Sequence, residues 1–210
     1  QIIDPEQIAK ITAKAFKIAE SGIPGPVVIS IPTDVLESKI FSLAEKNINK
    51  IVAKSNIEDV KKVAEEISIS KKPILVVGGE LQFSQKSKTL VKKVSSKFSL
   101  PVLCTYEHQD LIDNDDIHYA GELGLRPPES VKKNATEADL VICVGHRLNG
   151  VPNLGYTFPS EKQNFIHILP DGNYLGKLFK TNLGIISDSI NFLEQLLKIE
   201  LTDSIENKNK

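Results

Sequence analysis

The sequence predicts an α/β fold, in which helices cover both faces of a doubly wound parallel sheet of about six strands. Short apolar runs recur along the chain, segments with a helical apolar period separate them, and glycine or proline ends most of the runs. Leu140–Val144 is the clearest run, with five apolar residues that end at Gly145. Such a run is typical of a strand that is buried on both faces, as in a parallel sheet covered by helices.

The first two predicted elements stand apart from the rest of the pattern. We predict a helix over residues 5–21, because Asp4 can cap it, Pro5 suits its first position and Gln7 completes a capping-box spacing. Val27–Ile31 is mainly apolar and β-branched, which predicts a buried strand. One helix and one strand have no sheet of their own, so this pair forms an isolated αβ unit.

Regular alternation of helices and strands begins after a connector over residues 33–55, which keeps no sustained apolar period. The predicted helices start at Asn56, bury one face from Leu90 to Phe98, run from Pro127 to Ala135, and start again at Asp188. The predicted strands cover residues 74–77, 101–105, 140–144, 165–169 and 183–186, with a short strand near 117–120. Residues 202–210 are polar, and we expect them to fray.

The composition excludes several classes of protein. The chain has 210 residues, 40% of them hydrophobic and 25% charged, and a formal net charge of -1. This near-neutral charge gives no electrostatic case for nucleic acid or an anionic membrane, and no apolar run approaches the roughly 20 residues that span a bilayer. Cys104 and Cys143 lie in strand-like runs, so we expect buried, unpaired thiols and a cytoplasmic location. Because methionine is absent, we expect a fragment, a processed chain or an excised domain.

Familiar catalytic and metal-binding motifs are missing. There is no Walker loop, no G-x-G-x-x-G, no H-E-x-x-H, no G-x-S-x-G and no C-x-x-C. His108 and His118 lie among acidic residues, but their spacing matches no known metal site, so we interpret the segment as a solvated loop and predict no metal ligand. His167 lies inside an apolar strand, which favours a hydrogen-bonded core histidine over a ligand.

Glycines follow several predicted strands and indicate a binding edge. Gly78-Gly79, Gly124 and Gly145 each lie at or near a strand end, and Arg147 offers a fixed positive charge close to the last of them. The carboxyl ends of parallel strands share one edge of a sheet, where phosphates can approach backbone N–H groups and helix N-termini. The set predicts a nucleotide-type crevice, whereas each turn alone is equally an ordinary strand-to-loop connection.

The order of these segments resembles that of thiamine-diphosphate enzymes. Gly25–Val35 resembles the segment that closes their pyrimidine-binding domain, while Lys72–Gly79, Ala138–Arg147 and Phe165–Ile168 resemble their central domain. The group most similar is the acetolactate synthase-like proteins and related 2-oxo acid decarboxylases. The individual motifs are loose, but their order and spacing from about residue 5 to 197 are specific.

The resemblance implies a division of the chain into four parts. Residues 1–37 correspond to the last helix and strand of the pyrimidine-binding domain, 38–55 to a linker, 56–200 to a Rossmann-like central domain of six strands, and 201–210 to a disordered tail. The alternative is a stand-alone Rossmann-like nucleotide-binding or regulatory module. The isolated helix and strand at residues 5–32 favour the enzyme domain, because they make sense as the tail of a preceding domain.

The resemblance also implies that this chain is catalytically silent. The whole enzyme would act on a 2-oxo acid such as pyruvate, as a dimer or tetramer, with thiamine diphosphate and Mg²⁺. In the family an activating glutamate lies in the pyrimidine-binding domain, and a G-D-G motif with a downstream asparagine in a third domain holds the diphosphate and magnesium. Pro170-Asp171-Gly172-Asn173 lacks the first glycine of that motif, so we reject it as a thiamine site and predict no catalytic residue.

Central domains of the family hold FAD in acetolactate synthases, ADP in oxalyl-CoA decarboxylases, and nothing in several decarboxylases. Carried over by motif, the cofactor-binding positions are Gly78, Gly79, Thr105, Gly124, Leu125, Gly145, Arg147 and Asp171. Two features depart from the flavin pattern: Glu80 replaces the usual third glycine of the first turn, and Leu148-Asn149 follows Arg147 in place of an acidic run. We therefore favour an empty or adenine-nucleotide crevice over FAD.

Overall fold

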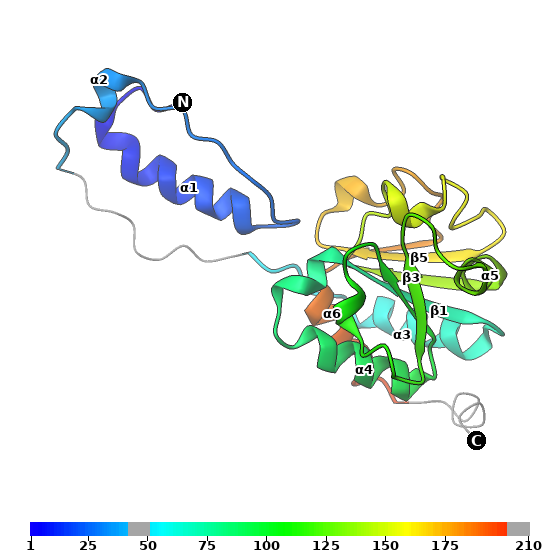
Figure 1. Cartoon of the computed structure of the whole chain (residues 1–210). Helices are drawn as coiled ribbons and strands as arrows, with labels where there is room; N and C mark the ends of the chain where they lie inside the picture. The colour runs from blue at the N-terminus through cyan, green and yellow to red at the C-terminus, as the bar shows by residue number, and fades with distance from the viewer. Residues whose placement is uncertain (42–50, 201–210) are drawn as a thin grey trace. The chain divides into compact units, whose positions relative to one another are not determined.

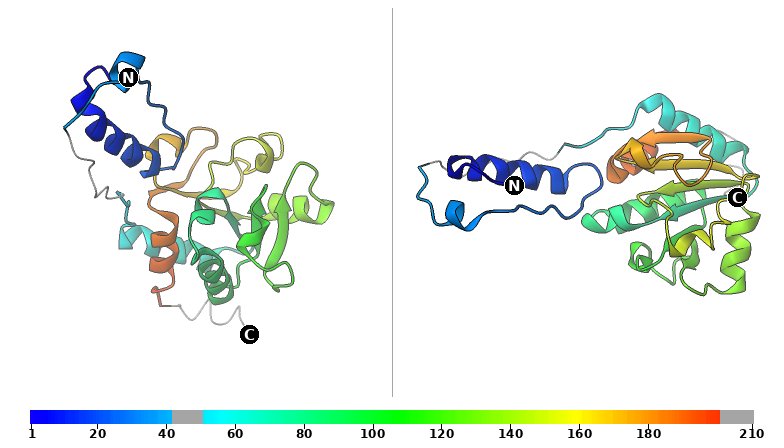
Figure 2. Two further views of the ribbon diagram at one scale, coloured as in Figure 1. Left: turned by 60° about the vertical axis from the view of Figure 1, so that its left-hand side comes forward. Right: turned by 90° about the horizontal axis from the view of Figure 1, so that it is seen from above.

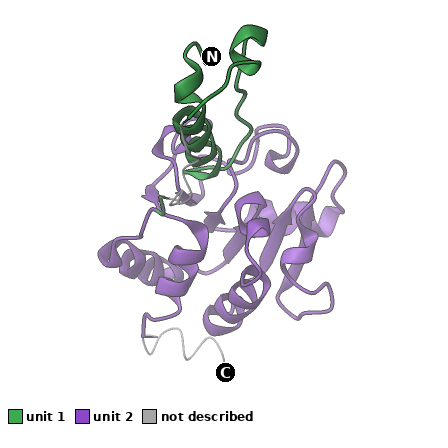
Figure 3. Ribbon diagram, turned by 90° about the vertical axis from the view of Figure 1, so that its left-hand side faces the viewer, with its two compact units in different colours: residues 1–52 green, residues 53–210 purple. Residues whose placement is uncertain are grey.

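The computed structural model describes residues 1–41 and 51–200, in two compact units that cover residues 1–52 and 53–210 (Figure 3). Residues 42–50 of the predicted linker and the predicted tail at 201–210 lie outside the described part of the chain. Among the helices that are described, none is both long and apolar enough to cross a membrane.

The larger unit is built on one parallel sheet of six strands, which confirms the predicted fold class (Figure 1). The strand order is β3-β2-β1-β4-β5-β6, which is the doubly wound order. Strands are added on one side of β1 up to β3 and then on the other side from β4, so the switch point lies between β1 and β4, which are parallel. The strands are β1 (Pro73–Val77), β2 (Val102–Thr105), β3 (Tyr119–Leu123), β4 (Leu140–Val144), β5 (Asn164–Leu169) and β6 (Leu183–Ile186).

Three helices cover one face of the sheet, and their apolar residues form one core with that face. These helices are α3 (Ile57–Ile69), α4 (Ser87–Phe98) and α6 (Ser189–Leu196). The other face packs against α5 (Glu129–Glu137) and against Leu148 and Phe158 from the long loop after β4. Figures 1 and 2 show α5 on the opposite side of the sheet from α3, α4 and α6. Side chains alternate between the two cores along β1, β2 and β4, as strand geometry requires.

Hydrogen bonds to one carboxylate fix the start of the central strands. The carboxylate of Asp139 accepts hydrogen bonds from the Lys71 and Lys72 backbone N–H groups at 2.7 and 2.8 Å, and from the Ser70 hydroxyl. Burial opposes ionisation of this group, but the three donors outweigh it and hold the pKa of Asp139 below its usual range. The segment before β1 is thereby tied to the residue before β4.

The sequence located most strands to within one residue, with β3 as the exception. A short strand was predicted near residues 117–120, whereas β3 covers Tyr119–Leu123. Asp116 explains the shift, because its carboxylate accepts from the His118 backbone N–H at 3.0 Å in a turn that precedes the strand. Cys104 and Cys143 are buried and unpaired as predicted, and burial raises the pKa of the Cys104 thiol to about 12.

The smaller unit contains the 3₁₀ turn η1 (Pro5–Gln7), α1 (Ile8–Glu20) and the short helix α2 (Thr33–Leu36). The predicted cap is confirmed, since Asp4 accepts from the Glu6 backbone N–H at 3.1 Å. The predicted strand at Val27–Ile31 is wrong, because these residues form no strand and Val28 is 91% exposed. A strand needs a neighbour that exchanges a ladder of backbone hydrogen bonds with it, whereas here the Ile2 N–H donates to the Ser30 carbonyl at 2.9 Å and no ladder forms among the described residues. The helix α2 also falls inside the predicted connector.

Candidate functional site

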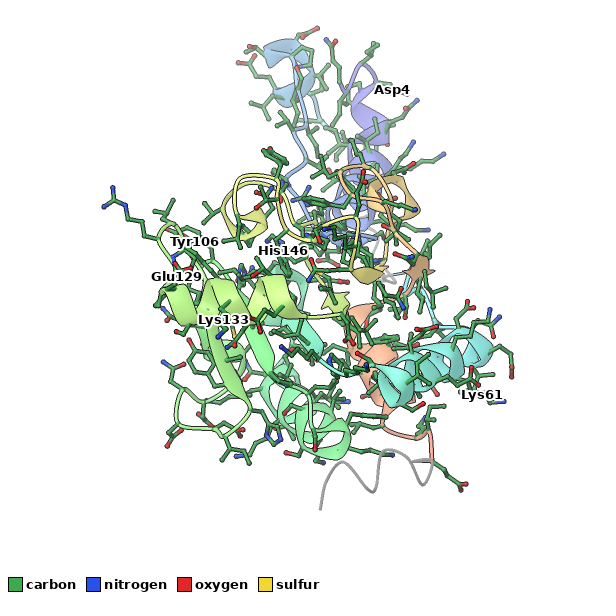
Figure 4. All side chains as sticks on the ribbon, turned by 90° about the vertical axis from the view of Figure 1, so that its right-hand side faces the viewer. Asp4, Lys61, Tyr106, Glu129, Lys133 and His146 are labelled. Atoms are coloured by element: carbon green, nitrogen blue, oxygen red, sulfur yellow. The ribbon has the colours of Figure 1, made fainter. Side chains whose placement is uncertain are left out.

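The carboxyl ends of β1 and β4 lie side by side at the point where the strand order reverses. Val77 pairs with Val144 as the last residue pair of these strands, so the turns at Gly78-Gly79 and at Gly145 meet. In open α/β sheets this is where a ligand crevice forms. Figure 4 shows Tyr106, which follows β2, and His146, which follows β4, at this same edge of the sheet.

The three glycines of this crevice face side chains of the protein itself. A Cβ atom at Gly78 would lie 2.5 Å from Thr105 Oγ1 and 2.6 Å from His146 Cβ. At Gly79 it would lie 3.0 Å from His108 Nε2. Glycine is required here because the protein's own side chains approach the backbone closely.

Four backbone N–H groups at the two turns already have protein acceptors. Gly78 donates to the Val144 carbonyl at 3.2 Å, and Glu80 donates to the Gly145 carbonyl at 2.9 Å. Leu81 and Gly145 likewise donate to protein carbonyls, at 2.9 and 3.1 Å. A bound phosphate needs such N–H groups free and pointing outward.

Two histidines, His108 and His146, cover the glycine turn. The Leu148 N–H donates to Nδ1 of His146 at 2.9 Å, so this ring nitrogen carries no proton. Burial, with smaller contributions from the nearby His108, Arg147 and His167, lowers the pKa of His146 to about 4. The rings of His108 and His146 meet edge to face, with 6.2 Å between their centroids. His108 Nδ1 lies 2.6 Å from the Tyr106 carbonyl oxygen, which can only accept, so His108 donates there.

The predicted core histidine, His167, holds the backbone of His146 in place. His167 on β5 is 3% exposed, and its Nε2 donates to the His146 carbonyl at 2.8 Å. The Cys143 thiol also donates to that carbonyl, at 3.4 Å. The prediction that His167 is a hydrogen-bonded core histidine is confirmed.

Glu80 fills the other side of the crevice. Its Cβ would lie 3.1 Å from a Cβ atom added at Gly145, and its carboxylate accepts a hydrogen bond from the hydroxyl of Ser189. Ser189 is the first residue of α6 and is 1% exposed. The side chain of Glu80 therefore spans from the turn after β1 to the start of α6. The sequence indicated Glu80 only as a charge unfavourable to phosphate binding. It did not indicate that Ser189, His108 and His146 also lie at this crevice.

Arg147 and Asp171 belong to a different part of the same edge. The guanidinium of Arg147 lies over the ring of Tyr174 at 5.0 Å, and the ammonium of Lys177 lies over the same ring at 5.3 Å. Asp171 accepts from the Asn173 N–H at 2.9 Å and thereby caps the 3₁₀ turn η5 (Gly172–Tyr174).

Gly124 and Leu125 line a separate open cavity of about 700 Å³, between the turn after β3, α5 and the loop after β4. The side chain of Leu125 is 71% exposed, and a Cβ atom at Gly124 would have no heavy atom closer than 3.7 Å. Of the eight predicted binding residues, the structure thus gathers four around one crevice: Gly78, Gly79, Thr105 and Gly145.

The residues of the crevice do not fit the diphosphate of FAD or ADP. Side chains fill the space over the glycines, four N–H groups at the turns already donate to protein carbonyls, and the carboxylate at the centre would repel phosphate. Metal binding has no support either, since no group of three histidine, cysteine, aspartate or glutamate residues in the described ranges could hold an ion. The assignment of these positions to a nucleotide stays a prediction.

Comparison with known proteins identifies the kind of domain. Residues 60–196, which include nearly all of the six-stranded unit, match the family described as thiamine pyrophosphate enzyme, central domain. The chain belongs to this family. Relatives of this central domain include the acetolactate synthase large subunit of Lactococcus lactis, 27% identical over 203 residues, and acetolactate synthase isozyme 1 large subunit of Escherichia coli, 29% identical over 202. The matches cover 95% and 92% of the chain but only 35% and 34% of those proteins.

Solved structures show the same fold for this thiamine pyrophosphate enzyme domain. A putative thiamin diphosphate-dependent enzyme from Mycobacterium smegmatis matches with a TM-score of 0.76 and 21% identity, over 96% of this chain and 39% of that one. Benzoylformate decarboxylase from Polynucleobacter necessarius matches with a TM-score of 0.71 and 22% identity, over 97% and 38%.

Proposed function

We propose that this central domain is the non-catalytic scaffold of a thiamine-diphosphate-dependent enzyme that acts on a 2-oxo acid such as pyruvate, in the manner of acetolactate synthase. The observation that carries the proposal is the family match over residues 60–196, which coincides with the parallel sheet and its helices. The chain spans about a third of its acetolactate synthase relatives, so binding of thiamine diphosphate and Mg²⁺ is assigned to other domains.

The hydrogen bonds of the loop after β5 support a non-catalytic role. Asp171, the residue that imitates the thiamine-binding motif, uses its carboxylate to cap η5. A Cβ atom at the adjacent Gly172 would lie 2.8 Å from Ile186 Cδ1, so this glycine serves packing against β6. The segment Pro170–Asn173 is therefore accounted for as a structural turn.

The smaller unit is proposed to be the end of a pyrimidine-binding domain, with boundaries at residues 1–37 and a linker over 38–55. Matches that cover 95–97% of the chain extend across this unit and support the proposal. The exposed apolar residues Val28, Phe41 and Phe16 also support it, because such residues are normally covered by a neighbouring element.

The working enzyme is proposed to be a cytoplasmic homo-oligomer, a dimer or a tetramer. Two buried, unpaired cysteines agree with a reducing compartment. The exposed apolar surface of the smaller unit agrees with burial against another domain or subunit.

An activity assay tests the proposal. The product of the complete open reading frame that encodes this chain is expected to consume pyruvate only when thiamine diphosphate and Mg²⁺ are added. The chain by itself is expected to give no turnover and no heat of binding with Mg-thiamine diphosphate. Saturable binding of thiamine diphosphate by the chain alone would contradict the scaffold assignment. Failure of the full product to use any 2-oxo acid would instead favour a stand-alone module.

A further inference from the structure

We propose that Glu80, Ser189 and His146 form an internal joint that takes the place of a bound dinucleotide at the switch point of the sheet. A cofactor in a structural role would connect the turns after β1 and β4. In this chain the side chains make that connection themselves. The inference rests on the proposed scaffold function, since it concerns how the scaffold holds its own centre together.

The Glu80 contacts carry the first step. Glu80 is held at both ends, because its backbone N–H donates to the Gly145 carbonyl at 2.9 Å and its carboxylate accepts from the Ser189 hydroxyl. One residue thus joins the turn after β1, the turn after β4 and the start of α6. A hydrogen bond to a charged acceptor is among the stronger ones in proteins.

The position of the carboxylate carries the second step. It lies against the first residue of α6, where the positive end of the helix dipole stabilises a negative group. A nucleotide phosphate would seek this kind of environment. The Glu80 carboxylate supplies the anion from within the chain, and its charge disfavours a second one beside it.

The histidine contacts carry the third step. His146 packs on Gly78, and its Nδ1 accepts a hydrogen bond from the Leu148 backbone N–H. The side chain of Leu148 is buried in the core on the α5 face of the sheet. Its carbonyl receives the Nε2–H of His167 from β5. His146 therefore anchors the loop after β4 to β1 and β5, over the glycine turn where a dinucleotide would otherwise lie.

Thermal unfolding of the whole chain tests the joint. Glu80→Ala is expected to lower the unfolding midpoint by about 3–6 °C, since a part-buried hydrogen bond to a carboxylate is lost. Ser189→Ala is expected to act in the same direction, and the double variant should unfold at the same midpoint as the worse single variant. Glu161→Ala, which removes an exposed carboxylate just before β5, is the matched control and is expected to change the midpoint by less than about 1 °C.

Nucleotide addition supplies the second measurement. FAD or ADP at about 1 mM is expected to leave the wild-type midpoint unchanged, because a ligand that binds the folded state must raise it. A saturable rise with either nucleotide would overturn the proposal, and so would a Glu80→Ala variant as stable as Glu161→Ala. Should Glu80→Ala fail to fold, Glu80→Gln keeps an acceptor oxygen and is expected to unfold between the wild type and Ser189→Ala. These results are independent of whether the full-length product uses thiamine diphosphate, so the two proposals fail separately.

Discussion

Two regions at the carboxyl edge of the sheet carry glycine turns with opposite surroundings. At the switch point, Gly78 and Gly145 face side chains so close that an added Cβ would lie 2.5 and 2.9 Å from the nearest atom. At the cavity beside β3, Gly124 has only ordinary contacts, and Gly150 in the neighbouring loop has no heavy atom within 4 Å. The first region is a packed joint, and the second is open to solvent.

The difference teaches that a glycine at a strand end has two physical meanings. It leaves room for a ligand in a nucleotide-binding turn, or it leaves room for the protein's own side chains. Which meaning applies depends on residues distant in the sequence, here Ser189 and His146. The predictions below separate the two regions, starting with the largest expected effect.

Replacing a glycine by alanine should distinguish the switch point from the open cavity most clearly. Gly78→Ala is expected to cost about 3 kcal/mol of unfolding free energy or more, because its Cβ overlaps Thr105 Oγ1 and His146 Cβ and neither can move away freely. Gly124→Ala is the control, with an expected change within about 0.5 kcal/mol. Urea denaturation measures both. Equal effects would mean that the switch point is open.

Acid should weaken the packed region through His146. Because its pKa is about 4 in the folded protein and near 6.5 when unfolded, the unfolded chain binds more protons between those values. Stability is therefore expected to fall as the pH drops from about 6.5 to 4, by about 3 kcal/mol from this residue. In His146→Asn, which retains a polar group but does not titrate, denaturation at a series of pH values should show a smaller loss. An unchanged acid profile would contradict the buried, neutral ring.

Two glycines with similar positive φ values isolate the effect of contact. Gly145 and Gly155 have φ values of +74° and +70°, and a Cβ atom at Gly155 would have no heavy atom within 4 Å. Alanine at Gly155 is expected to cost about 1 kcal/mol from the positive φ alone. Alanine at Gly145 should cost about 2 kcal/mol more, because its Cβ also meets Ser189 Oγ and Glu80 Cβ. Similar losses in urea denaturation would argue against the joint.

The open cavity should respond least. Arg126 lines it and is exposed, so Arg126→Ala is expected to change the unfolding free energy by less than about 0.5 kcal/mol. Thermal unfolding checks this. A loss comparable to that of Gly145→Ala would mean that the cavity is also structural.

Local patterns were sufficient to predict most of the fold. Leu140–Val144 forms β4 because its apolar residues are covered on both faces, and Asp188 caps α6 as its side chain suggested, accepting from the Asn191 N–H at 3.0 Å. Val27–Ile31 has a similar composition yet forms no strand, since its state depends on a neighbour that the sequence pattern cannot supply.

The site was only partly predictable for the same reason. The meeting of Gly78, Gly79 and Gly145 follows from parallel strands alone. The hydrogen bond between Glu80 and Ser189 joins residues more than a hundred positions apart, and no local pattern signals it. The charge of Glu80 next to two glycines was the available hint, and it indicated exclusion of phosphate without revealing the partner.

The closed state of the switch point is tested most directly by amide NMR of the whole chain, with and without FAD or ADP. The account predicts slow hydrogen exchange at Gly78, Glu80, Leu81 and Gly145 without any ligand, because each N–H donates to a buried carbonyl. It also predicts no change in their chemical shifts when either nucleotide is added. Fast exchange at these amides together with saturable shifts would show an open nucleotide site and contradict it.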